Sequence, residues 1–258
     1  MWDRLSDQLT DLTQRKVGVI VFAGLAAIEE LLQQVRASPI PIVINSGDLV
    51  RDGLVASMNR PGGNVTGVSS LVGELSGKQL GLLRDLVPKA ATIAALFDPR
   101  QGSEDGNRIW LRENVGDAAA ALRQKLLVLE AKTAEEIDAQ FASLDREPAD
   151  AMLVIVSPFF IIRAAQIVAL AARHRIPAIY YRREFAEAGG LMSYGSSIAE
   201  VSRETGRYAG RILNGEKPAD LPIIQPTKLE LVINLKAAKA LSLTIPPGVF
   251  AITDEIIE

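Results

Sequence analysis

The chain contains no cysteine and a single histidine, His174. Without cysteine it cannot form disulfides, thiolate metal sites or a thiol nucleophile. His174 follows Arg173 at the expected C-terminal end of a helix, where capping of the helix is a better interpretation than catalysis. A Ser-His-Asp triad would have to use this residue, and no nucleophile motif accompanies it. We therefore expect a non-enzymatic protein with no catalytic residue, no metal site and no cofactor.

Basic residues are not in excess, and long apolar runs are missing. The formal net charge is -3, which argues against nucleic acid as a partner because phosphate binding needs clustered Lys and Arg. No apolar run is long enough to span a bilayer, so no membrane span is expected. Residues 1–7 are polar and do not resemble a secretion signal, so the sequence as written predicts a cytoplasmic protein. Phosphate-loop and dinucleotide-binding glycine motifs are also absent.

Short apolar runs alternate instead with helical patterns along the chain. Apolar residues make up 48% of the 258 positions, enough for two lobes with separate cores. This alternation predicts an α/β fold with mostly parallel sheets. The expected strands are 17–22, 42–44, 65–70, 92–97, 126–129, 151–156, 178–181, 191–194 and 229–233. The expected helices are 3–14, 25–35, 53–57, 75–86, 108–124, 134–144, 160–174, 198–213 and 235–241, and a Pro246-Pro247 tail follows.

Polar and aromatic residues gather where the expected strands end. Open α/β sheets bind ligands at the carboxyl ends of their strands, and a small-molecule site needs polar groups beside aromatic faces. The candidate ligand-binding residues are Ser46, Asp48, Ser69, Ser70, Asp98, Ser157, Phe159, Tyr181, Glu184, Phe185 and Tyr194.

Each candidate also has a purely structural interpretation. Capping of the following helix suits four of them as well as ligand contact does: Ser46, Asp48, Asp98 and Ser157. Phe159 and Phe185 are equally suited to a core, the commoner place for an isolated phenylalanine. Residues 182–184 could form a solvated charge run. The functional signal therefore lies in the convergence of many strand ends.

Several long stretches resemble the ABC transporter substrate-binding protein family, which includes the tryptophan-binding TrpX type. The stretches are PGGNVTGVS at 61–69, LRDLVP at 83–88, EFAEAGGLMSYG at 184–195, GRYAGRILNGEKPADLP at 206–222 and LVINLKAAKAL at 231–241. Their order and spacing match the family over almost the whole chain. The sequence departs from its relatives at Leu49, where proline is common, and at 97–100, which lacks asparagines often seen there.

The resemblance implies a type I periplasmic-binding-protein architecture, with two Rossmann-like lobes that close by a hinge motion on a small molecule. The first lobe would comprise 1–88 and 191–218, and the second 89–190 and 219–258. Family members usually begin with a secretion signal and an initial strand, helix and strand. The resemblance therefore implies a periplasmic protein whose N-terminus is truncated and whose first lobe is incomplete. It also implies a membrane permease as partner.

Three functions are consistent with these observations. The leading one is the solute-binding receptor of an ABC importer, with an amino acid or aromatic metabolite as ligand. A ligand-sensing regulatory domain of the same fold is the second, although no helix-turn-helix precedes the first lobe. An enzyme using Asp48, Asp98 or Glu184 as acid or base is the third, but no pair of these carboxylates has a diagnostic spacing.

Overall fold

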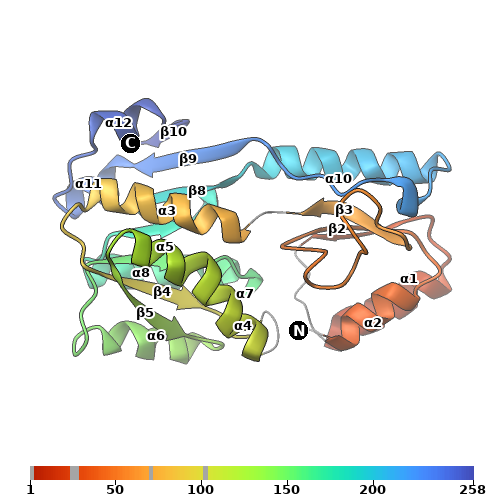
Figure 1. Cartoon of the computed structure of the whole chain (residues 1–258), viewed down its shortest axis with the longest axis horizontal. Helices are drawn as coiled ribbons and strands as arrows, with labels where there is room; N and C mark the ends of the chain where they lie inside the picture. The colour runs from red at the N-terminus through yellow and green to blue at the C-terminus, as the bar shows by residue number, and fades with distance from the viewer. Residues whose placement is uncertain (1–2, 24–28, 70–71, 101–103) are drawn as a thin grey trace. The chain divides into compact units, whose positions relative to one another are not determined.

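The chain forms two compact α/β units (Figure 1). The computed structural model describes residues 3–23, 29–69, 72–100 and 104–258. Unit 1 comprises Met1–Leu71 and Ser196–Lys228, and unit 2 comprises Val72–Gly195 and Leu229–Glu258. The chain therefore passes between the units at 71–72, at 195–196 and at 228–229.

Unit 1 is built on a three-stranded parallel sheet with the order β1-β2-β3. Its elements are α1 (Asp3–Gln14), β1 (Ile20–Ala23), α2 (Glu29–Ala37), β2 (Ile42–Ser46), β3 (Val65–Ser69), α10 (Ile198–Leu213) and the 3-10 helix η2 (Pro218–Asp220). Side chains of β2 alternate between two cores, as they must on a pleated strand. Ile42 and Ile44 pack in a cluster with Leu9 of α1, whereas Val43 packs with Tyr208 of α10. Helices thus cover both faces of this sheet.

Unit 2 holds a seven-stranded sheet with the order β10-β9-β8-β7-β6-β4-β5. The strands are β4 (Thr92–Phe97), β5 (Lys125–Glu130), β6 (Ala151–Val154), β7 (Ala178–Tyr180), β8 (Met192–Ser196), β9 (Leu229–Asn234) and β10 (Glu255–Ile257). The helices are α3 (Val72–Leu86), α4 (Glu104–Leu111), the π-helical turn η1 (Arg112–Gly116), α5 (Asp117–Ala121), α6 (Ala134–Ser143), α7 (Pro158–Ile162), α8 (Ala164–Arg173), α9 (Arg183–Glu187), α11 (Leu235–Ala240) and α12 (Pro247–Ala251).

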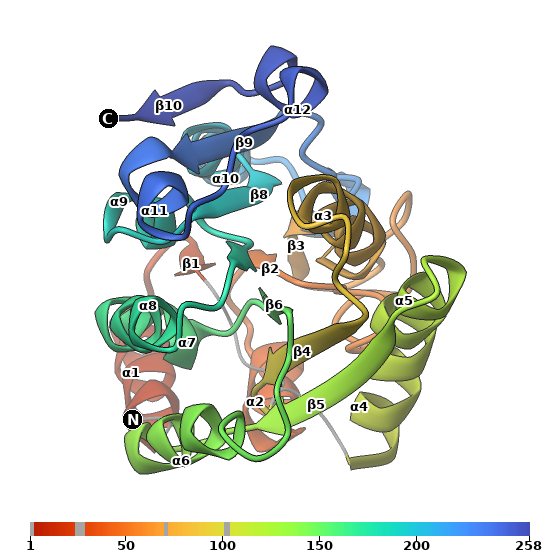
Figure 2. The ribbon, with the colours of Figure 1, turned by 90° about the vertical axis from the view of Figure 1, so that its left-hand side faces the viewer.

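Helices α3 and α5 lie on one face of the unit 2 sheet, and α6 and α8 lie on the other (Figure 2). Strand β4 lies between β6 and β5 and contributes to both cores. Ile93 and Ala95 belong to the cluster on the α3 side, and Ala94 and Leu96 to the cluster on the α8 side. This double burial explains why the strand is apolar throughout its length. The strands from β5 to β8 pair in parallel, so their carboxyl ends share one edge.

The division into units differs from the lobe boundaries expected from the sequence. Helix α3, which precedes the expected boundary at Pro88, packs through Leu80 and Leu83 into the same core as Ile93 and belongs to unit 2. The segment after η2 belongs to unit 1 because its backbone bonds to this unit. The Ile223 amide donates to the Met58 carbonyl at 2.7 Å.

Most expected elements are present, with differences in short segments. The helix expected at 53–57 is wrong, because turns and bends occupy this stretch and Gly53 adopts a left-handed φ of 66°. The sequence interpretation missed α9, α12 and β10, each of at most five residues. The start of the helix expected at 25–35 lies outside the described residues. Among the described helices, none is both long and apolar enough to cross a membrane.

Candidate functional site

Asp98 and Ser157 come together at the carboxyl edge of the unit 2 sheet. They follow β4 and β6, which are neighbouring parallel strands. The Ser157 hydroxyl donates to Asp98 Oδ2 at 2.6 Å and accepts a hydrogen bond from the Phe159 amide at 3.1 Å. Both side chains are buried. The Ser157 hydroxyl therefore has two roles, because it caps α7 and also orients the Asp98 carboxylate. The structural and the ligand-binding interpretations of these residues are therefore compatible.

Arg100 completes this cluster. Its Nε donates to Asp98 Oδ1 at 2.9 Å and its Nη2 donates to Asp98 Oδ2 at 2.8 Å, a two-point pairing. The hydrogen bond with Asp98 raises the pKa of the Arg100 guanidinium, although burial acts in the opposite direction. The guanidinium carbon lies 4.5 Å from the centre of the Phe159 ring. The Arg100 side chain is 38% exposed while that of Asp98 is 4% exposed, so the cation is the accessible partner.

Three further candidates follow β7, and the structure places them differently from one another. Tyr181 is buried. Phe185 lies in the core on the α8 side, where its ring stacks on Tyr180 with centroids 4.6 Å apart. Glu184 is partly exposed and accepts from Arg182 Nη2 at 2.7 Å. Burial favours the neutral acid, but hydrogen bonds from Arg182 and the backbone outweigh it and lower the pKa of Glu184.

Tyr194 lies on β8, two strands away from β6 in the sheet. It is partly buried, and its carbonyl accepts from Gln79 Nε2 of α3 at 2.8 Å. Burial and the nearby Asp254 carboxylate raise the pKa of its phenol, which stays protonated at neutral pH. No described contact joins Tyr194 to the Asp98 cluster.

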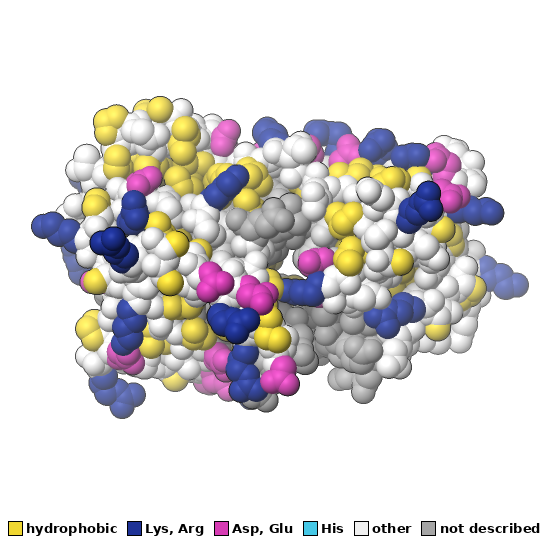
Figure 3. All heavy atoms as spheres, in the orientation of Figure 1, with side chains coloured by type: hydrophobic (Ala, Val, Ile, Leu, Met, Phe, Trp, Pro, Cys, Tyr) yellow, Lys and Arg dark blue, Asp and Glu magenta, His cyan; other side chains and the backbone are white. Residues whose placement is uncertain are grey.

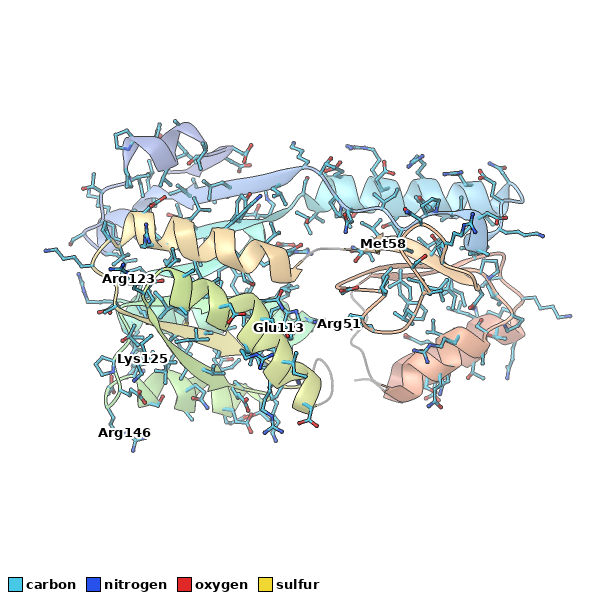
Figure 4. The ribbon with its side chains drawn as sticks, viewed as in Figure 1. Arg51, Met58, Glu113, Arg123, Lys125 and Arg146 are labelled. Atoms are coloured by element: carbon cyan, nitrogen blue, oxygen red, sulfur yellow. The ribbon has the colours of Figure 1, made fainter. Side chains whose placement is uncertain are left out.

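The unit 1 candidates lie where β2 and β3 end. Ser46 and Ser69 are backbone partners in the parallel pair. The buried Ser69 hydroxyl donates to the Gly47 carbonyl at 2.6 Å, and exposed Asp48 accepts from the Val50 and Arg51 amides at 3.1 and 3.0 Å. Asp48 thus holds the turn that carries Arg51, which is labelled with Met58 in Figure 4. Ser70 lies outside the described residues.

Charges elsewhere on unit 2 are intermixed. Basic and acidic side chains are interspersed on the face seen in Figure 3. Arg123, Lys125 and Arg146 come from the end of unit 2 where β5 begins (Figure 4), and Lys125 Nζ lies 2.8 Å from Glu147 Oε1. Over the described part of the chain, no group of three or more His, Asp or Glu side chains is arranged to hold a metal ion.

Sequence reasoning missed Arg100 and Arg182 as members of these clusters. Each lies close in sequence to a predicted carboxylate, two residues from Asp98 in one case and from Glu184 in the other. An arginine two residues from an acidic residue near a strand end is therefore the sequence pattern that would have predicted both. The Asp98 cluster joins buried acceptors, an accessible cation and an aromatic ring, which suits recognition of a small polar molecule.

Comparison with known proteins identifies the family. The family model described as ABC transporter substrate binding protein matches residues 4–257, so the chain belongs to this family. The chain is also 26% identical over 211 residues to a tyrosine-binding protein of Clostridioides difficile. That alignment covers 79% of this chain but 57% of the relative, so the chain spans little more than half the length of this curated protein.

Solved structures share the fold. The structure of an ABC domain in complex with L-Trp from Streptococcus pneumonia matches with a TM-score of 0.86 and 23% identity, covering 99% of this chain and 84% of that one. A conserved domain protein from Vibrio cholerae matches with a TM-score of 0.83 and 22% identity, covering 97% of this chain and 83% of that one. The predicted type I periplasmic-binding-protein fold and the family resemblance are both confirmed.

Proposed function

We propose that this protein is the solute-binding receptor of an ABC importer and that its ligand is an aromatic amino acid. The Asp98 cluster is the observation that carries the proposal. Asp98 and Ser157 supply buried oxygens, Arg100 supplies an accessible cation, and Phe159 supplies an aromatic face. An amino acid has an ammonium, a carboxylate and a side chain that these three chemistries complement.

The relatives support the same ligand class. One is named a tyrosine-binding protein, and the structure from Streptococcus pneumonia is a complex with L-Trp. Both ligands are zwitterions with a large ring. The proposed activity is binding without chemical conversion, so Asp98, Glu184 and Asp48 act as binding or supporting groups.

We propose that the two units are the lobes that move when this receptor closes. In this proposal, Ser46, Asp48, Ser69 and Ser70 contribute from unit 1, and the Asp98 cluster contributes from unit 2 together with Tyr181, Glu184, Phe185 and Tyr194. A ligand that binds the closed form better than the open form shifts the equilibrium towards the closed form. A membrane permease is the proposed partner of that form, and the proposed location is outside the cytoplasmic membrane.

Isothermal titration with L-Tyr, L-Trp and L-Phe, and with L-Ala as the non-aromatic comparison, tests this function. We expect saturable binding of at least one aromatic amino acid and much weaker binding of L-Ala. Arg100→Gln should weaken the binding by about 10-fold or more, the loss expected for one charge-assisted hydrogen bond. Arg146→Gln is the matched control, because Arg146 lies at the end of unit 2 where β5 begins. A folded protein that binds none of these ligands, or equal effects of the two variants, would contradict the proposal.

A further inference from the structure

A groove with a volume of about 570 Å³ lies on the surface of unit 2. Its walls come from the last turn of α3, from residues that follow α3 and α5, and from the start of α12. The chain enters β4 and β5 shortly after these segments of α3 and α5, so the groove lies near the amino ends of both strands. The Asp98 cluster follows the carboxyl ends of β4 and β6. The groove is therefore separate from the candidate functional site.

The lining of the groove is largely apolar and continuous with the core of unit 2. Val249 belongs to the core cluster on the α3 side of the sheet, and Leu122 packs against that cluster. Pro88 and Pro246 complete the apolar part of the lining. Among the described residues that line the groove, none has a buried polar side chain, whereas a small-molecule site needs a few polar groups that converge on the ligand. The lining therefore suits contact with another protein better than capture of a small ligand.

Helix α12 also exposes large apolar side chains to solvent. Phe250 of this helix is 50% exposed, and Ile252, which follows the helix, is 60% exposed. Both are close in sequence to Val249, which lines the groove. Hydrophobic side chains gather over α12 on the face seen in Figure 3. Exposed apolar side chains that are grouped in this way are typical of a surface that binds another protein.

Two residues of opposite charge line the groove. Arg84 and Asp85 are neighbours in the last turn of α3, and both are exposed. Neither side chain forms an ion pair or a hydrogen bond with any other residue that the structure describes. In an interface between two identical copies related by a two-fold axis, residue i of one copy contacts residue j of the other, and j contacts i. A surface with an unpaired cation beside an unpaired anion is therefore complementary in charge to a second copy of itself.

We propose that this groove is the interface of a homodimer, in which a second copy of the chain is its occupant. Across the two-fold axis, Arg84 of each copy pairs with Asp85 of the other, and the apolar lining and the exposed side chains of α12 are covered. Because the pairing is reciprocal, the dimer is closed and association stops at two copies. The dimer leaves the Asp98 cluster of each copy uncovered, and the proposal does not rest on the function proposed above.

Sedimentation velocity of the full chain over a range of protein concentrations tests the proposal. We expect an equilibrium between monomer and dimer. Arg84→Asp and Asp85→Arg should each weaken the dimer by about 10-fold or more, because both ion pairs are lost and like charges face each other in their place. An equimolar mixture of the two variants should dimerise as the wild type does, because the acidic surface of one variant then faces the basic surface of the other. Misfolding of either variant could not produce this rescue.

Arg203→Asp is the matched control for reversal of a charge. Arg203 is an exposed arginine of α10 that does not line the groove, so this variant should dimerise as the wild type does. A wild type that stays monomeric at every concentration would overturn the proposal and leave the groove to a different partner. Equal dimerisation of the wild type and both single variants, a mixture of the two variants that stays monomeric, or growth beyond two copies would also overturn it.

Discussion

The Ser157 hydroxyl donates a 2.6 Å hydrogen bond to Asp98 Oδ2, and the two residues are 59 positions apart in the chain. The bond joins the segments that follow β4 and β6. Arg100 donates to both oxygens of the same buried carboxylate, so Asp98 Oδ2 accepts from Ser157 and from Arg100, and Oδ1 accepts from Arg100. The candidate site is thus part of the stability of unit 2, and some substitutions there should change folding and binding together.

Ser157→Ala should destabilise the protein by more than the loss of a helix cap. It removes both the cap of α7 and the hydrogen bond to a buried carboxylate, so we expect a cost of about 2–4 kcal/mol. Thr133→Ala is the matched control, because Thr133 caps α6 by accepting from the Glu136 amide, and the carboxylate beside it, that of Glu135, is exposed and not buried. Its expected cost is about 1 kcal/mol. Urea unfolding measures both, and equal costs for the two variants would show that the Asp98 bond contributes nothing.

Phe159→Leu should weaken the binding of aromatic ligands more than the binding of aliphatic ligands. If Phe159 offers its face to an aromatic ligand, leucine keeps apolar volume and loses the ring interaction, which is worth about 0.5–1.5 kcal/mol or roughly 2- to 12-fold in affinity. Binding of a non-aromatic ligand should change little. The control is Phe250→Leu on α12, which is 50% exposed and lies on a different helix from Phe159 of α7. Titration calorimetry with one aromatic and one aliphatic amino acid measures the ratio of their affinities. If this ratio is the same in Phe159→Leu and Phe250→Leu, Phe159 makes no ring contact with the ligand.

Gly67→Ala should destabilise unit 1. Gly67 lies in β3 with φ at 151°, and an added Cβ would lie 1.9 Å from the Ile44 carbonyl oxygen of β2. Because the obstacle is backbone of the paired strand, the sheet itself would have to move, at a cost on the order of 3 kcal/mol. Gly63→Ala is the control, since an added Cβ there meets nothing within 4 Å. Thermal unfolding that is unchanged in Gly67→Ala would contradict this close approach of β2 and β3.

The sequence predicted the long elements of the fold well, because their signals are local. The strand expected at 92–97 and the helices expected at 3–14 and 198–213 have the observed bounds. The last of these ends at Leu213 and is followed by the C-cap Asn214 and by Gly215 with a φ of 100°, the stop signal that the sequence offers. Short segments such as α9 were missed, because their structure depends on tertiary packing more than on periodicity.

The candidate site was predictable only as a set of strand ends. The sequence indicated that Asp98 and Ser157 each follow a strand, but β5 lies between them in sequence and the sheet order places β4 directly beside β6. Strand order is a long-range property, so the hydrogen bond between these residues could not be inferred. The stacking of Phe185 on Tyr180 in a core was equally hidden, because it depends on which face of α9 packs inward.

Glu184→Gln should change how stability depends on pH. The pKa of Glu184 is lowered in the folded protein, so its charge stabilises the fold above its ordinary value of about 4.5, and this contribution is lost as the pH falls through the folded value. The stability difference between the wild type and Glu184→Gln should therefore be constant near neutral pH and shrink below pH 4.5. When Arg182→Gln is already present, adding Glu184→Gln should change the pH dependence of stability much less, because Arg182 donates to the Glu184 carboxylate. Thermal unfolding of the wild type, both single variants and the double variant between pH 3 and pH 7 measures the coupling. A difference that grows as the pH falls would mean that burial, which raises the pKa, outweighs the hydrogen bonds from Arg182.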